Sequence, residues 1–283
     1  MEQPSEELFF GFSDEWEDFG KRHPALLERF PTFISAITAA FIRDTTLSEL
    51  IDKFVLLYGR LCCEDFSEVL LCCGNGYGFA GQKLVRSLYE RAVTLRYLHE
   101  HPDELQAFID FNDVATRKLL LSAEETFGRQ LLQPDAREKV EEDYKTVQAQ
   151  FMVTDCKVCG TKRLNHTWSK LDFAAMAKRV GSLGDLIVPA YYMPLRQAHA
   201  TFGSLLSRLA EGERQEILFN HAAQRKQADY ALMTAHNIML DVLKVQDERF
   251  KVPELGEKIE ECFRDFSEIY AKNQRNPCAE SEM

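Results

Sequence analysis

Apolar residues recur along most of the chain at spacings of three and four residues, and strict alternation of apolar and polar positions is almost absent. The first pattern is typical of amphipathic helices and the second of half-buried strands. The sequence therefore predicts an all-α protein, a single bundle-like domain of many helices with peripheral helices at both ends. In this prediction, residues 1–45 form an N-terminal helical extension, 46–250 the helical core, and 251–283 a C-terminal helix and a disordered tail.

Within the core, long helices are predicted to begin after Thr46, after the glycines at 76–81 and at Pro102. Thr46 followed three residues later by Glu49 is typical of a capping box, and proline suits the first turn of a helix. Residues 152–170 are expected to be irregular. Further helices are predicted over 6–42 (as two short helices), 134–151, 171–180, 190–209, 215–250 and 253–270.

The segment from Gly76 to Gly81 satisfies the pattern G-x-G-x-x-G of dinucleotide-binding proteins. A dinucleotide site of that kind needs a strand before the turn and a second strand after the following helix. Here both flanking segments have helical spacing, and no G-K-[ST] follows to make a phosphate-binding P-loop. The glycines are therefore predicted to form a tight helix-to-helix turn, one of them as a C-cap.

The composition is that of an ordinary soluble globular protein, with 45% hydrophobic and 28% charged residues. Its apolar runs are far shorter than the ~20 residues of a membrane-spanning helix. The acidic N-terminus lacks the basic region of a secretory signal, so we expect a cytoplasmic protein without a membrane partner. The net charge of −11 disfavours a general polyanion binder. Only the basic segment 157–208 leaves RNA as an alternative partner.

Cys156 and Cys159 are separated by two residues and His166 follows seven residues later, as in one half of a zinc site. A closed structural site needs four ligands. The fourth would have to be a distant cysteine such as Cys262 or Cys278, or come from a second subunit. We expect no cofactor and a reduced pair of loop cysteines, with a structural zinc as the alternative.

Arg86 and Glu90 are spaced four residues apart on a predicted helix, where they can form an ion pair. The helix is apolar enough to be central, so the pair is expected to be shielded from water. Such a pair either locks neighbouring helices together or lines a polar pocket. Tyr191, Arg196 and His199 follow at near-helical spacing further along the chain.

The segment LVRSLYERAVTLRYL at 84–98, followed by the proline and acid at Pro102, resembles an uncharacterised bacterial family, Domain of Unknown Function family 5677. The resemblance covers about residues 50–205. It includes a loop tryptophan and a tyrosine-to-histidine motif at 191–199, in which Leu195 replaces the usual serine. The resemblance implies a helical fold but no activity. It also implies that one pocket is surrounded by Arg86, Glu90, Trp168, Tyr191 and His199.

The first function hypothesis is a ligand-binding or interaction module with a polar Arg/Glu/His pocket, within bacterial stress or defence systems. Its partner is an unknown ligand or protein. The predicted ligand-binding residues are Arg86, Glu90, Trp168, Tyr191, Arg196 and His199.

The alternative hypothesis is a metal-independent ribonuclease of the HEPN type, which is also all-helical. Arg214 and His221 have the spacing R-x6-H at the start of a predicted long helix, and Arg196 with His199, three residues apart, is the other candidate pair. The histidine would move a proton during attack on the phosphate, while the arginine would stabilise the developing charge. Because such nucleases form their active sites across a dimer, a homodimer is part of this alternative.

Overall fold

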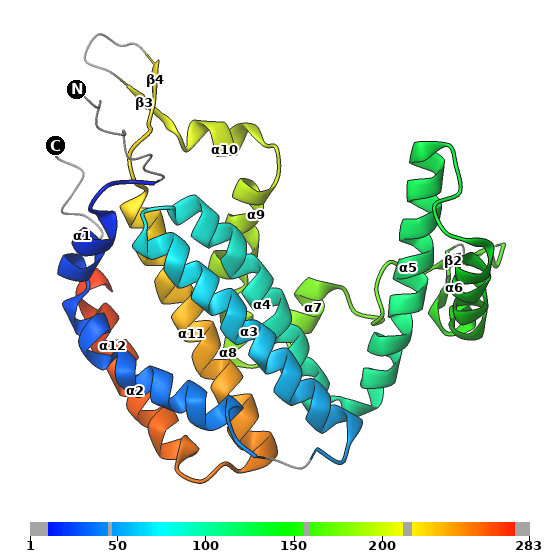
Figure 1. Cartoon of the computed structure of the whole chain (residues 1–283), viewed down its shortest axis with the longest axis horizontal. Coiled ribbons are helices and arrows are strands. Elements are labelled where there is room, and N and C mark those ends of the chain that lie inside the picture. The colour runs from blue at the N-terminus through cyan, green and yellow to red at the C-terminus, as the bar shows by residue number, and fades with distance from the viewer. Residues whose placement is uncertain (1–10, 45–46, 156–158, 212–216, 275–283) are drawn as a thin grey trace, which may run out of the picture. The chain divides into compact units, whose positions relative to one another are not determined.

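The structure, a computed structural model, describes residues 11–44, 47–155, 159–211 and 217–274. It confirms that the chain is all-α, with two small two-stranded sheets beside the helices (Figure 1). The chain divides into two compact units, and each is described by itself. Unit 1 is built from residues 1–99 and 177–283, and unit 2 from 100–176.

Unit 1 contains the helices predicted at both ends of the chain and three long helices of the predicted core, two beside the glycine turn and one that ends at Phe250. Its helices are α1 (Glu15–Arg22), α2 (Pro24–Phe41), α3 (Leu50–Gly74), α4 (Gly78–Glu100), α8 (Ser182–Asp185), the π-helical turn η3 (Val188–Tyr192), α9 (Met193–Ala198), α10 (Phe202–Leu206), α11 (Arg225–Phe250) and α12 (Leu255–Gln274), and its strands are β3 (Leu209–Glu211) and β4 (Ile217–Phe219). The short helix α7 (Phe173–Ala177) crosses the boundary of the two units.

Helix α11 forms the centre of unit 1 and carries buried residues from Ala228 to Gln246. It runs antiparallel to α3. At one end of this pair, the Gln224 amide donates a hydrogen bond to the Gly76 carbonyl at 2.8 Å. At the other end, the Gln246 side-chain amide donates to the Val55 carbonyl at 2.8 Å. Helices α2 and α12 pack against each other and against α11 (Figure 1).

The glycine pattern lies at the turn between α3 and α4, as the sequence predicts. Gly76 has a φ of +79°, a conformation that glycine adopts without steric cost. A methyl group at Gly81 would lie 2.7 Å from the Cys73 sulfur atom. The elements on both sides of this turn are helices, so the pattern serves close packing and does not form a dinucleotide-binding turn.

Two predicted helices differ from those observed at their N-termini. Helix α3 begins at Leu50, and its N-cap is Glu49, which forms a capping box with Asp52. Thr46, the predicted N-cap, lies outside the described residues. The helix predicted from residue 215 begins only at Arg225, because the preceding chain forms the antiparallel pair of β3 and β4.

The helix predicted over 190–209 is wrong as a single element. The structure contains η3, α9 and α10 in this segment. Pro189 and Pro194 lie in the first turns of η3 and α9, where their missing N–H groups do not interrupt a hydrogen-bond ladder. A new N-cap at Thr201, whose side chain accepts a hydrogen bond from the Ser204 amide, starts α10.

In its described residues, unit 2 is built mainly from two α-helices, two short 3-10 helices and a β-hairpin. Its elements are η1 (Pro102–Glu104), α5 (Leu105–Phe127), α6 (Pro134–Val147), η2 (Gln148–Phe151), β1 (Met152–Thr154) and β2 (Lys162–Leu164). Two ion pairs join α5 to α6: Arg117 with Glu141 at 2.8 Å and Glu124 with Arg137 at 3.2 Å. Helix α6 has no buried residue, and these part-buried pairs join it to α5 together with the Arg117 guanidinium over the Tyr144 ring at 4.2 Å.

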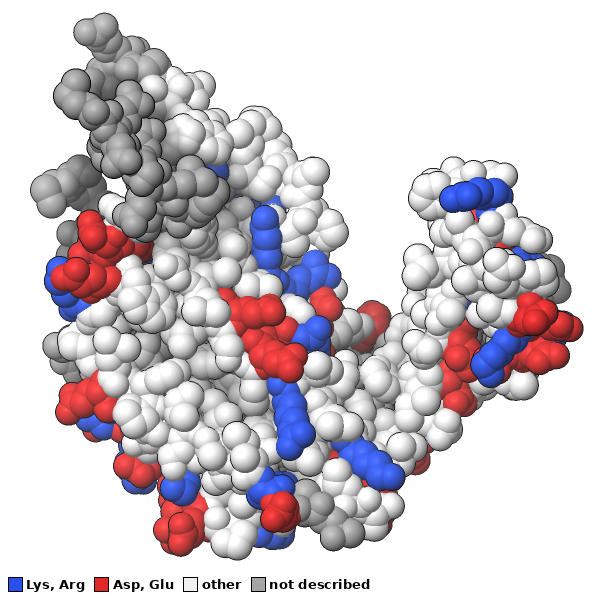
Figure 2. All heavy atoms as spheres, viewed as in Figure 1, with Lys and Arg blue, Asp and Glu red and all other residues white. Residues whose placement is uncertain are grey.

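The charges on the surface are mixed. On the face drawn in Figure 2, Lys and Arg side chains are scattered among Asp and Glu side chains and do not gather in one basic area. RNA binding through residues 157–208 stays a prediction. In the described parts of the chain, no helix combines the length and the apolar character needed to cross a bilayer.

His236 on α11 is a titratable side chain inside the core of unit 1. Aromatic rings surround it, with Phe33 at 4.5 Å, Phe266 at 5.3 Å and Tyr270 at 5.9 Å between ring centres. Its Nδ1 lies 3.4 Å from the Tyr270 hydroxyl, and its Nε2 is buried without a hydrogen-bond partner among the described residues. Burial lowers the pKa of His236 from its ordinary value of 6.5 to about 4.

This lowered pKa makes the stability of the protein depend on pH. Between pH 6.5 and 4 the unfolded chain binds a proton at His236 that the folded chain excludes, so the free energy of unfolding falls as the pH falls. From pH 7 to pH 5 we expect this residue alone to lower it by about 2 kcal/mol. Urea unfolding at both pH values should show that His236→Phe lacks this part of the decrease. An equal decrease in the variant would contradict the burial of a neutral imidazole.

Candidate functional site

Arg86 and Glu90 lie one turn apart on α4, as the sequence predicts. The Arg86 Nε donates a hydrogen bond to the Glu90 carboxylate at 2.8 Å. The pair is only partly shielded from water, with 22% of the Arg86 side chain and 41% of the Glu90 side chain exposed. It is therefore a pair at the edge of the core and not the desolvated pair that the apolar helix led us to expect.

The segment from η3 to the end of α9 brings two more predicted residues to this pair. The Arg86 guanidinium carbon lies 4.6 Å from the centre of the Tyr191 ring, which is the distance of a cation–π contact. The Arg86 Nη1 lies 3.5 Å from Nε2 of His199, the exposed C-cap residue of α9. We call these four residues, Arg86, Glu90, Tyr191 and His199, the arginine cluster.

Two other predicted ligand-binding residues are not part of these contacts. The Arg196 guanidinium lies beside Gly203 in α10, so close that a methyl group at Gly203 would come within 3.0 Å of it. Trp168 belongs to unit 2, where its ring packs edge-on against Phe108 at 5.4 Å.

Of the two pairs predicted for the ribonuclease, Arg196 lies in α9 and His199 is the C-cap residue of that helix. The other pair is Arg214 and His221. His221 is exposed and precedes α11, and its ring lies 4.9 Å from the ring of Phe219. Arg214 lies outside the described residues. The expected start of a long helix that would place both side chains on one face is therefore wrong.

The predicted zinc ligands lie only partly within the described residues. Cys156 and Cys278 lie outside them. Cys159 is exposed, and its Sγ is 2.8 Å from the Thr161 hydroxyl oxygen. Among the residues that the structure describes, no three His, Cys, Asp or Glu side chains are grouped so that they could hold a metal ion. A structural zinc stays a prediction.

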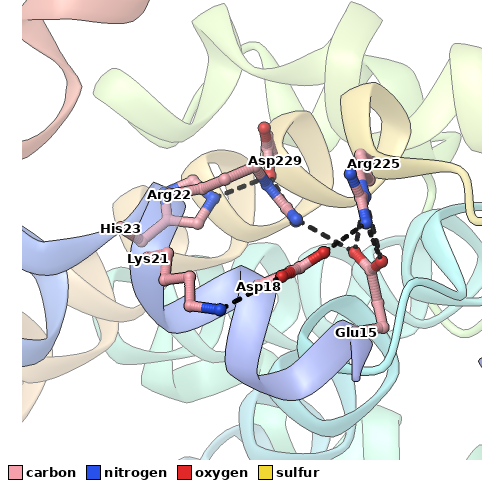
Figure 3. A network of polar contacts seen from close by, with 7 residues as sticks. All are labelled: Glu15, Asp18, Lys21, Arg22, His23, Arg225 and Asp229. Carbon is pink, nitrogen blue, oxygen red and sulfur yellow. Dashed lines mark hydrogen bonds and ion pairs between the residues drawn. The ribbon is translucent and has the colours of Figure 1, made fainter. Parts of the chain in front are cut away.

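A polar network at the N-terminal end of α11 was not predicted. Glu15 on α1 is 1% exposed and accepts hydrogen bonds from Arg225 on α11, at 2.9 Å from Nε and 2.7 Å from Nη2 (Figure 3). Arg22 donates to the same carboxylate at 3.0 Å. The His23 Nε2 lies 2.8 Å from a carboxylate oxygen of Asp229 on α11. The contacts to α11 come from α1 and from His23, which directly follows α1. They join residues about 200 positions apart in the sequence, so the network fastens the N-terminal segment to the core.

A large groove in unit 2 was also not predicted. It lies along α5 and is closed on one side by the chain at the end of β2. Its only detectable sequence signal is the spacing of Phe111, Val114 and Leu119 on one helical face, and this spacing alone does not distinguish a groove from a packed core.

Large apolar side chains are exposed over the segment from η3 to β4, a feature typical of surfaces that bind other proteins. They are Val188, Tyr192, Met193, Phe202, Leu205, Leu206, Ile217, Leu218 and Phe219. A protein partner or a second copy of the chain stays a prediction.

Comparison with known proteins identifies a family. A family model described as a family of unknown function, DUF5677, matches residues 53–217. No curated protein and no solved structure matches the chain. The matched range contains the arginine cluster and all of unit 2. It does not contain α1, α2 or the central helix α11.

Proposed function

We propose that this chain, which belongs to the DUF5677 family of unknown function as its motifs predicted, is a binding module. In this proposal, which rests on the chain's own side chains, the arginine cluster binds an anionic group of the ligand. The observation that supports this proposal is the fixed position of the Arg86 guanidinium. Glu90 holds its Nε at 2.8 Å, and the Tyr191 ring lies against its face at 4.6 Å.

A guanidinium held in this way is prepared for an anion. Its Nε is used by Glu90 and its Nη1 faces the Nε2 of His199 at 3.5 Å, so Nη2 and the second N–H of Nη1 are left to donate to a phosphate or carboxylate oxygen. His199 places a second nitrogen 3.5 Å from Nη1 and is exposed, so an incoming anion could reach both side chains. Little side-chain entropy is lost on binding, because Tyr191 and Glu90 already restrict the arginine.

The competing explanation is that the cluster only fastens the segment from η3 to α9 onto α4. The Arg86–Glu90 pair lies within one helix and contributes little to such fastening. Between the two segments, Arg86 contacts both Tyr191 and His199. A structural role predicts a loss of stability when Arg86 is replaced, but it predicts no response to an added anion.

We expect inorganic phosphate to shift the NMR signals of the His199 ring in a saturable way. Arg86→Gln should weaken this binding about tenfold or more, because it removes a charge-assisted hydrogen bond. Arg264→Gln, which replaces an exposed arginine on α12, is the matched control and should leave the binding unchanged.

The proposal would be overturned if phosphate did not shift the His199 signal of the wild type. It would also be overturned if Arg86→Gln bound phosphate as tightly as the wild type does. The ribonuclease alternative has less support, because His221 is exposed in the chain before α11. Cleavage of a labelled RNA by the wild type that is abolished in His221→Ala would favour that alternative instead.

A further inference from the structure

The groove along α5 has a volume of about 530 Å³. This size lies within the range of about 300–1,000 Å³ that is typical of small-molecule sites. All of its lining residues belong to unit 2. They are Phe111, Val114, Ala115, Lys118, Leu119, Ser122, Leu164, Asn165 and His166, and we call this site the α5 groove.

The groove exists because α6 packs on a different side of α5. An α-helix turns by about 100° per residue, so 111, 114, 118 and 122 share one face. Arg117 and Glu124, which form the ion pairs to α6, lie on another side, more than a quarter turn from the middle of that face. The side chain of Leu119 is 71% exposed as a result.

The opposite wall is held in place by hydrogen bonds. The Asn165 amide donates to the Phe151 carbonyl at 2.8 Å, and its side chain donates to the Ser169 carbonyl at 2.9 Å. Phe151 is buried and packs edge-on against Phe111 at 5.1 Å between ring centres. The wall is thus anchored to α5, so the groove is formed before any ligand arrives.

Lys118 is the charged side chain in the lining of the groove. The lining also contains His166 but no aspartate or glutamate, although acids outnumber Lys and Arg by 45 to 34 in the whole chain. The nearby acids Asp110 and Glu124 are occupied elsewhere, by Gln150 and Arg137. Lys118 has no ion-pair partner among the residues that the structure describes.

We propose that the α5 groove binds a small amphipathic carboxylate, with its alkyl or aromatic body against Phe111, Leu119 and Leu164 and its carboxylate beside Lys118. An apolar lining supplies affinity through the burial of apolar surface, and a single cation fixes the orientation of the ligand. His166 lies on the β2 side of the groove and adds a second nitrogen for the carboxylate. This site is separate from the arginine cluster and does not depend on it.

The test compares octanoate with octan-1-ol, which has the same alkyl chain without the charge, by calorimetric titration of the full chain. We expect octanoate to bind at least tenfold more tightly than octan-1-ol. Lys118→Gln should remove this preference and leave the affinity for octan-1-ol unchanged. Leu119→Asn should weaken both ligands, and Lys170→Gln, an exposed lysine outside the lining, should change neither.

Lys118 is exposed, so its replacement is expected to leave the fold intact, which circular dichroism would verify. The absence of saturable octanoate binding by the wild type would overturn the proposal. Equal affinity for octanoate and octan-1-ol would also overturn it, because the cation would then have no part in recognition. Tighter binding of octanoate that persists in Lys118→Gln would place the site elsewhere and equally count against the α5 groove.

Discussion

Replacing Gly78 with alanine should lower the free energy of unfolding by about 3 kcal/mol or more. A methyl group at this position would lie 2.3 Å from the Gln224 carbonyl oxygen and 2.4 Å from the Ala228 amide nitrogen. Both are backbone atoms at the start of α11, so relief would require the first turns of α4 and α11 to separate. Urea unfolding followed by circular dichroism would measure the loss.

The matched control is Gly20→Ala within α1, where the nearest atom to the new methyl group would be the Leu27 Cδ1 at 3.4 Å. Alanine is the better helix former by about 1 kcal/mol, so this variant should be as stable as the wild type or slightly more stable. Equal unfolding midpoints for Gly78→Ala and the wild type would show that α4 and α11 do not approach each other this closely.

Local patterns predicted the helices well, because a helix is specified by residues three and four positions apart. The spacing of apolar residues and the break at the glycines predicted α3 and α4, and Pro102 predicted the start of the next helical segment. Arg86 and Glu90 were predicted as an ion pair for the same reason. The contacts of Arg86 with Tyr191 and His199 were implied only by the family resemblance, because more than 100 residues separate Arg86 from both.

The features that were missed depend on pairings between distant or very short segments. Strands β3 and β4 contain three residues each, too few for an alternating pattern to be recognised, and their pairing moved the start of α11 to Arg225. The α5 groove is likewise formed by a helix face and the chain after β2, more than 40 residues away. No periodicity within α5 indicates what lies opposite it.

Replacing Glu15 with glutamine should lower the free energy of unfolding by about 1–3 kcal/mol, because the buried side chain loses its charge-assisted hydrogen bonds to Arg225 and Arg22. The Glu15 carboxylate is 1% exposed and is shared by Arg225 and Arg22 (Figure 3). The matched control is Glu17→Gln, since Glu17 is 69% exposed and pairs with Lys21. It should cost less than about 1 kcal/mol.

A double-mutant cycle with Arg225→Gln would separate this ion pair from the rest of the network. The loss in the double variant should be smaller than the sum of the two single losses, because residues in direct contact are coupled. Additive losses would show that Glu15 and Arg225 do not stabilise each other. Coupling would show that the Glu15–Arg225 ion pair fastens α1 to α11. Helix α3 packs on α11, and most of α3 lies in the range 53–217 that the family model matches. The stability of the matched range would then depend on helices outside it.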